Sequence, residues 1–137
     1  MNRIDFQEIA ELRLRESKAL LAAGIPEGAY YLAAFAVECA LKACIAKRTQ
    51  RHDFPDKDSR KWFIHDLEDL VGFARLKVEL DDAMKTNPAL KTNWTIVRNW
   101  SEESRYERKK SVQEASDLLR AIEDFQGGLL PWVRLRW

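Results

Sequence analysis

The chain has 137 residues and a net charge of +1, with 46% hydrophobic and 33% charged residues. This composition excludes a disordered chain and is typical of a globular protein with one domain, residues 1–137, large enough to bury a core without metals or disulfides. A net charge this close to zero also excludes an overall basic field, so any surface that attracts nucleic acid must be local.

The N-terminal segment 1–18 lacks the apolar run of a signal peptide. The apolar run 28–46 is near the minimum length of a membrane span, but it is alanine-rich and carries two charges. We therefore expect a buried core helix, no membrane association and a cytoplasmic location. Cys39 and Cys44 lie five residues apart in this run, on different faces of a helix, which predicts buried free thiols in a reducing compartment.

The first predicted helix covers about residues 5–23, where Gly24 provides a C-cap and Pro26 suits the first turn of a second helix. That second helix is the apolar one, over about residues 27–48. The polar segment 49–61 contains a proline and clustered charges, which indicates a loop.

A short helix is predicted from His65–Asp66–Leu67 to about Ala74, followed by a second piece over residues 76–85. Asn87–Pro88 breaks this piece, and Pro88 begins a helix that continues toward Trp100. The last long helix has the clearest helical period and ends at two glycines, 127 and 128. Its predicted apolar stripe is Val112, Ala115, Leu118, Leu119, Ile122 and Phe125.

No segment alternates long enough for a strand, so the sequence predicts an all-α antiparallel bundle with one short extra helix. The segment 129–137 is too apolar to lie free in water, and we expect it to pack on the bundle or on a partner protomer. In this tail Arg134 and Arg136 alternate with Leu135 and Trp137, a pattern that suits a half-buried edge.

Glu38 and Lys42 are four residues apart in the apolar helix, where each charge needs a hydrogen-bond or ion-pair partner. One interpretation is an internal salt bridge between them at a seam of the bundle. The other is a binding site in which Lys42 offers its charge to a phosphate and Glu38 orients it. The sequence contains no phosphate-binding glycine loop, no metal-binding spacing and no catalytic serine triad, so we expect no metal and no cofactor.

His65 precedes a helix start, where it either packs and caps or acts as a base or a phosphate donor near neutral pH. The segment 100–110 combines aromatic rings with cations, and Arg105 and Tyr106 are adjacent in it. Such a mixture is used to hold nucleotides or single strands by stacking and charge, although solvated charge before a helix is the more common reason for it.

In order, these segments resemble a HEPN domain, the nucleotide-binding domain of higher eukaryotes and prokaryotes. The resemblance covers nearly the whole chain and depends on four pieces. They are the helix from Gly28 through Glu38 to Lys42, then His65–Asp66–Leu67, then Trp100 to Tyr106, and a closing helix that leads to Trp132 and Trp137. It implies an up-and-down four-helix bundle with one short extra helix, usually a two-fold dimer.

Many HEPN proteins are metal-independent ribonucleases with an arginine, four to six residues and then a histidine near the last helix. Here the positions after Arg105 hold Lys110, Ser111 and Val112, so that motif is absent. Arg60 and His65 have the spacing, but they lie in an earlier segment of the chain.

The resemblance therefore implies a non-catalytic, homodimeric module that binds a nucleotide, RNA or a partner protein. Its binding residues would be Glu38, Lys42, His65, Arg105 and Tyr106. Other members act beside a small nucleotidyltransferase or as halves of toxin–antitoxin pairs, which makes such a protein an expected partner. Two alternatives stay open: a divergent ribonuclease that uses His65 and Arg105 as catalytic residues, and a purely structural interaction subunit.

Overall fold

A computed structural model gives the structure of this chain and describes residues 1–51 and 63–137. All regular secondary structure in these residues is helical, which confirms the predicted all-α class. The described residues contain seven α-helices and a 3-10 helix, η2. The sequence predicts fewer elements, namely four helices and one short extra helix. The elements are α1 (Arg3–Ala22), α2 (Pro26–Arg51), α3 (Leu67–Phe73), α4 (Lys77–Thr86), α5 (Pro88–Arg98), η2 (Glu102–Tyr106), α6 (Val112–Glu123) and α7 (Leu129–Arg134).

Most of the predicted loop 49–61 falls in residues 52–62, outside the described ranges, as do His52 and Arg60. Elsewhere, local capping sets the helix ends. The side chain of Asn87 accepts a hydrogen bond from the Leu90 amide, and Pro88 occupies the first turn of α5. Gly24 has a φ of 78°, a left-handed conformation that favours glycine, and it turns the chain from α1 into α2.

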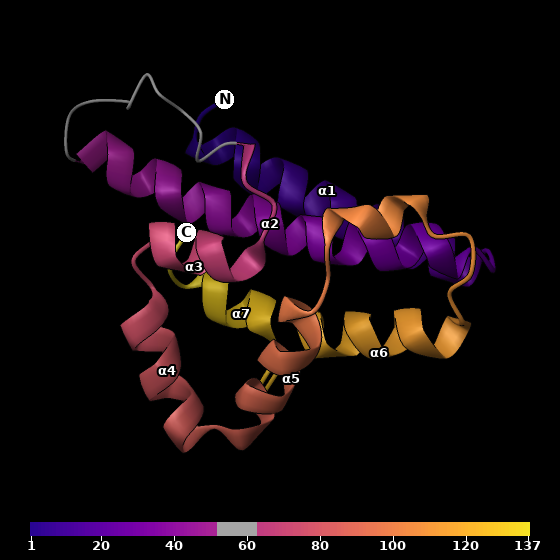
Figure 1. Ribbon diagram of the computed structural model, residues 1–137. Helices are drawn as coiled ribbons and strands as arrows, with labels where there is room; N and C mark the ends of the chain where they lie inside the picture. Colours follow the sequence, from indigo (N-terminus) through magenta and orange to yellow (C-terminus); the bar gives the residue numbers. More distant parts are fainter. Residues whose placement is uncertain (52–62) are drawn as a thin grey trace.

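Helix α2 is the central element of the fold, and it contacts α1, α3, η2, α6 and α7 (Figure 1). It is joined to α1 by residues 23–25, so these two helices lie side by side and antiparallel. Alanine side chains let the neighbouring helices approach α2 closely, because they fill little space. The fully buried ones are Ala29, Ala33, Ala34, Ala36, Ala40 and Ala43.

Helices α4 and α5 pack on each other and form an arm that projects from the bundle below α3 and α7 (Figure 1). Helix α5 connects this arm to α6 and α7 through the buried side chains of Leu90, Trp94 and Val97. By length and hydropathy one described helix, Pro26–Thr49, could cross a membrane, and 78% of its most apolar window is buried within the fold. A core helix has the same properties.

The segment 129–137 folds back on the bundle, one of the two expected outcomes, and contains the helix α7. Its side chains Leu129, Leu130 and Val133 are completely buried. The guanidinium of Arg134 forms two hydrogen bonds of 2.8 Å with the carboxylate of Glu11 on α1. Arg3 Nη2 donates to the backbone oxygen of Trp137 at 2.7 Å, which joins the two ends of the described chain.

The predicted apolar stripe of the last helix is wrong at both of its ends. Val112 is 56% exposed and Phe125 is 91% exposed, whereas Ala115, Leu118 and Ile122 are buried. Helix α6 ends at Glu123, and the backbone of Asp124 leaves the helical region, so Phe125 no longer follows the helical period. Helical spacing predicts which face is apolar, but it does not predict how far the covering neighbours extend.

Candidate functional site

Glu38 is the centre of a buried polar cluster on the inner face of α2. Its side chain is 1% exposed, and its Oε1 atom accepts a hydrogen bond from Lys42 Nζ at 2.7 Å. The same oxygen lies 2.9 Å from His65 Nδ1. The salt bridge that is one of the two interpretations of this pair therefore forms, and the cluster has a third member, His65, from a segment outside α2.

His65 extends this cluster to the 3-10 helix η2. Its Nε2 atom lies 3.1 Å from Glu102 Oε2, so a carboxylate faces each ring nitrogen. Only the protonated imidazolium can donate from both nitrogens at once, because the neutral ring carries a single N–H. Glu102 was not predicted, although it lies in the segment from Trp100 to Tyr106, because no local spacing links it to His65, 37 residues earlier in the sequence.

Three buried polar atoms near this cluster have no hydrogen-bond partner among the described residues. They are Glu38 Oε2, Trp100 Nε1 and Ser104 Oγ. Trp100 packs on α2 through Tyr31, with ring centroids 5.8 Å apart. Buried polar atoms are nearly always paired in folded proteins, so these three mark where the packing of η2 on α2 leaves hydrogen-bonding capacity unused.

Arg105 and Tyr106 form a second group at the end of η2, separate from the contacts of Glu38. The Arg105 guanidinium carbon lies 5.0 Å from the centre of the Tyr106 ring, and Tyr106 is 73% exposed. The electrostatic effect of Tyr106, with a smaller one from Tyr31, raises the pKa of Arg105 above its ordinary value. The structure thus brings Glu38, Lys42 and His65 together and pairs Arg105 with Tyr106 on the neighbouring surface.

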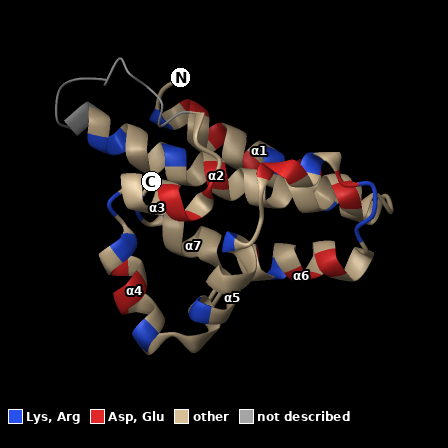
Figure 2. Ribbon diagram, viewed as in Figure 1, with Lys and Arg blue, Asp and Glu red and all other residues tan. Residues whose placement is uncertain are grey.

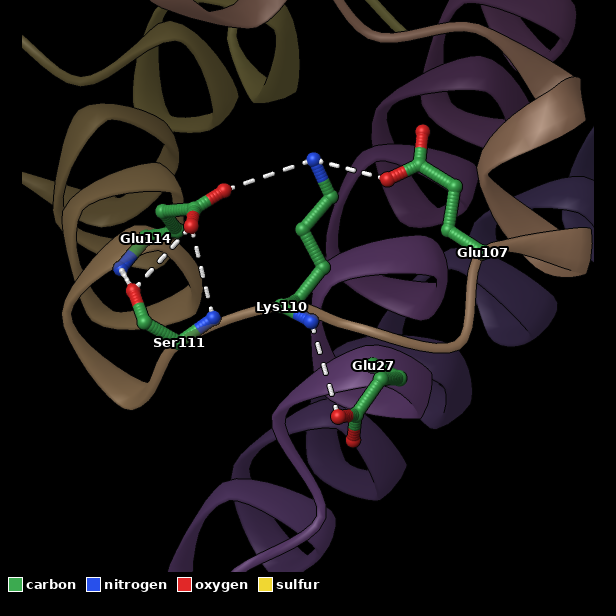
Figure 3. A network of polar contacts seen from close by, with 5 residues as sticks. All are labelled: Glu27, Glu107, Lys110, Ser111 and Glu114. Atoms are coloured by element: carbon green, nitrogen blue, oxygen red, sulfur yellow. Dashed lines mark hydrogen bonds and ion pairs between the residues drawn. The ribbon is translucent and has the colours of Figure 1, made fainter.

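Lys110 has a structural role in the segment that follows η2 (Figure 3). Its Nζ atom forms ion pairs with Glu107 at 2.9 Å and Glu114 at 3.4 Å, and it lies 4.2 Å from the centre of the Tyr30 ring. The hydrogen bond to Glu107 is the largest of the effects that raise the pKa of this ammonium group. Lys110 therefore ties the segment to both α2 and α6.

The same network sets the start of α6. The Ser111 hydroxyl accepts from the Glu114 amide at 3.0 Å, and Glu114 Oε1 faces the Ser111 amide in a capping box (Figure 3). This backbone hydrogen bond is the main reason why the pKa of Glu114 is lowered. The carboxylate of Glu27 also approaches the Lys110 amide at 3.5 Å, so α2 contributes to the anchor.

Two cations of this segment, Arg108 and Lys109, are exposed, and the described residues provide no ion pair for either. Together with Arg105 and Tyr106 they make up what we call the η2 surface, defined as Arg105, Tyr106, Arg108 and Lys109. The backbone that carries these side chains is held in place by the ion pairs of Lys110 and by the buried side chains of Trp100 and Ser104. The surface thus presents three cations and one aromatic ring from a rigid support.

No group of three or more His, Cys, Asp or Glu side chains in the described residues is arranged to hold a metal ion. In the cluster of Glu38, the two carboxylates lie on opposite sides of the imidazole and do not converge. A hollow of about 680 Å³ lies elsewhere, between α3, α4 and α5, and is lined by residues such as Phe73, Leu80 and Trp94. None of the five predicted site residues lines it.

No protein-family model matches this sequence, and neither a curated protein nor a solved structure matches it.

Proposed function

We propose that the protein is a HEPN-like, homodimeric helical module of the cytoplasm that binds a nucleotide or single-stranded RNA without cleaving it. The observation that carries the proposal is the pairing of the exposed Tyr106 ring with the Arg105 guanidinium on a firmly anchored 3-10 helix. Proteins hold single strands by stacking bases on aromatic rings while cations meet the phosphates. The η2 surface offers both kinds of group within one short segment.

In this proposal each residue has a separate task. Tyr106 stacks on a base, a contact worth about 1–3 kcal/mol in other single-strand binders. Arg105 donates to a phosphate, and Arg108 and Lys109 add charge along the backbone of the ligand. Glu38, Lys42 and His65 are buried or half-buried and act as positioning residues, because they hold η2 on α2 through Glu102.

The surroundings of His65 support binding rather than cleavage. A general base must hold a free lone pair toward the ribose hydroxyl. Both ring nitrogens of His65 face carboxylates at about hydrogen-bonding distance, 2.9 and 3.1 Å, and neither is directed to the exposed Arg105–Tyr106 pair. No histidine occupies positions 110–112, where the motif would place it after Arg105, and this supports the same conclusion.

A second candidate function is that of an interaction subunit, for example beside a small nucleotidyltransferase or in a toxin–antitoxin pair. An exposed apolar patch favours it. Phe125 is 91% exposed and Leu135 is 82% exposed, and both line a hollow of about 190 Å³ with Pro131 and Trp132. Exposed apolar patches of this kind are common at protein interfaces, including those between two copies of one chain.

The binding proposal is tested by fluorescence anisotropy with a labelled single-stranded RNA of about ten nucleotides. The double variant Arg105→Ala/Tyr106→Ala should weaken binding by at least about tenfold, since it removes one stacking contact and one phosphate contact. The control Arg15→Ala removes an exposed cation from α1 and should change the affinity less than about twofold. Both variants should keep the wild-type thermal midpoint.

Equal affinity of wild type and Arg105→Ala/Tyr106→Ala would contradict the proposal, as would the absence of any RNA or nucleotide binding by the wild type. Cleavage is tested separately by incubating the RNA with concentrated protein in EDTA. The RNA should stay intact. Cleavage that is lost in His65→Ala would establish the ribonuclease alternative instead.

A further inference from the structure

A second group of cations converges at the other end of α2, away from the η2 surface. A hollow of about 250 Å³ lies between the end of α2, the start of α4 and the C-terminal segment. Lys47 and Arg48 line it from α2, Arg136 lines it from the C-terminal segment, and Cys44 and Glu79 are also part of the wall. Figure 2 shows the Lys and Arg residues gathered on this end of α2.

Arg136 is held in a fixed position at this hollow. Its Nε atom donates to Glu79 at 2.9 Å, its Nη1 atom donates to the Trp132 backbone oxygen at 2.9 Å, and its guanidinium lies 3.8 Å from the Trp132 ring centre. These contacts leave Nη2 without a hydrogen bond among the described residues. A guanidinium oriented in this way loses little conformational freedom when it binds an anion.

The charges at this hollow do not cancel. Glu79 is the single carboxylate among the lining residues, and it is paired with Arg136. Lys47 and Arg48 are half-buried, and within residues 1–51 and 63–137 neither forms an ion pair. The hollow therefore has an excess of two positive charges, and anions are favoured in such a concave, partly desolvated place.

The thiol of Cys44 lies in the wall of the same hollow, beside these cations. Burial raises the pKa of Cys44 to about 11, while the charges of Lys47, Arg136 and Arg3 act in the opposite direction. Cations near the end of α2 also complement the helix dipole, which explains Lys47 and Arg48 on their own. The helix dipole does not explain why Arg136, which lies almost 90 residues later in the sequence, is fixed at the same hollow.

We propose that Lys47, Arg48 and Arg136 form an anion site that binds a phosphate or diphosphate group. Liquid water occupies about 30 Å³ per molecule, so the hollow has the volume of about eight waters, which is enough for a diphosphate. Lys47 and Arg48 supply mobile donors and Arg136 supplies the fixed one. The site is independent of the η2 surface and of the proposed RNA binding.

The test is calorimetric titration of the purified chain with inorganic pyrophosphate at low ionic strength. Lys47→Gln/Arg48→Gln should weaken binding by at least about tenfold, because each charge-assisted hydrogen bond contributes about as much as a tenfold change in affinity or more. The control Arg15→Gln/Lys91→Gln removes the same charge from exposed positions on α1 and α5. It should change the affinity less than about twofold.

Three results would overturn the site: no binding to the wild type, unchanged affinity in Lys47→Gln/Arg48→Gln, or an equal loss in the control. A second measurement needs no variant. Pyrophosphate at low ionic strength should raise the thermal midpoint of the wild type, because a ligand that binds only the folded state stabilises it. An unchanged thermal midpoint at saturating pyrophosphate would also overturn the proposal.

The source of the phosphate is distinguished in the Arg105→Ala/Tyr106→Ala background, which is designed to lose binding at the η2 surface. Displacement of pyrophosphate by a 5′-phosphorylated oligonucleotide, but not by its 5′-hydroxyl counterpart, would support the site and identify a terminal phosphate of RNA. If neither oligonucleotide displaced pyrophosphate, the site would be supported, and its ligand would be a small phosphorylated molecule. Equal displacement by both oligonucleotides would indicate diffuse attraction of polyanions and would overturn the site.

Discussion

Glu38 and His65 are 27 residues apart in the sequence, and a contact of 2.9 Å joins Glu38 Oε1 to His65 Nδ1. The same oxygen accepts the hydrogen bond of Lys42 at 2.7 Å. One buried carboxylate oxygen therefore holds a lysine of its own helix and a histidine of the segment before α3. Through His65 and Glu102 it also fixes the position of η2.

The substitution Glu38→Gln should destabilise the protein by about 1.5–3 kcal/mol, because a neutral amide replaces the buried carboxylate that accepts a charge-assisted hydrogen bond from Lys42. The measurement is urea unfolding followed by circular dichroism. Glu68→Gln is a matched control, since it breaks an exposed ion pair with Arg98 and should cost less than about 1 kcal/mol.

The double variant Glu38→Met/Lys42→Met should recover much of the stability lost in Glu38→Gln, because apolar side chains replace both charges at once. If Glu38→Gln and Glu68→Gln unfolded at the same urea concentration, the pair would not be buried in solution. The central role given to Glu38 would then be wrong.

The two buried cysteines should make the fold sensitive to alkaline pH. Burial raises the pKa of Cys39 from 9.0 to about 12 and that of Cys44 to about 11. A raised folded-state pKa means that this stability is complete below pH 9 and is lost as the pH rises through 11 to 12. The thermal midpoint should therefore fall between pH 9 and pH 11.

Lysines and tyrosines also titrate in this range, so the control is the variant Cys39→Ala/Cys44→Ala. It should be less stable than the wild type at pH 7 because it loses buried volume. Its thermal midpoint should nevertheless decline less between pH 9 and pH 11. Parallel pH profiles of the two proteins would show that the thiols do not contribute.

The helices could be predicted from the sequence where a local signal sets their ends. Asn87–Pro88 begins α5 as predicted, and the turn at Gly24 separates α1 from α2. The sequence also allowed the Glu38–Lys42 contact to be predicted, because both residues lie on one face of a helix. In each of these cases the deciding interaction lies within about four residues.

Features set by distant parts of the chain could not be predicted. Glu102 approaches His65 across 37 residues, and only the packing of η2 on α2 creates that contact. Phe125 has the right spacing for the stripe of α6, yet it lies past the end of that helix. Lys110 belongs to a cationic run by composition, but Tyr30, Glu107 and Glu114 give it a structural role.

Gly128 should not tolerate a side chain. A Cβ atom there would lie 2.5 Å from both the amide nitrogen and the carbonyl oxygen of Asp124, and backbone atoms cannot move aside cheaply. We expect Gly128→Ala to destabilise the protein by about 3 kcal/mol or more in urea unfolding. The thermal midpoint should fall correspondingly.

Gly72, within α3, is the matched control because a Cβ atom there meets nothing within 4 Å. Gly72→Ala should stabilise the protein by about 0.5–1 kcal/mol, since alanine is the better helix former. A stability loss in Gly72→Ala as large as that in Gly128→Ala would mean that crowding is not the cause.

Two adjacent lysines, Lys109 and Lys110, should respond differently to the same substitution. Lys110→Gln breaks two ion pairs and the contact with the Tyr30 ring, so it should lower the stability by about 1–2 kcal/mol. Lys109→Gln should leave the stability unchanged and weaken RNA binding, with a smaller salt dependence of the affinity. A stability loss in Lys109→Gln would show that this lysine supports the fold.

Arg3 and Trp137 contact each other directly although they are 134 residues apart in the sequence. The first and last residues of this fold can therefore be linked by a short peptide that does not have to cross the molecule. New ends could then be opened in an exposed turn, such as residues 23–25 between α1 and α2. In such a circular permutant the order of the helices along the chain changes, while the arrangement of α1, α2 and α7 around their shared core is kept.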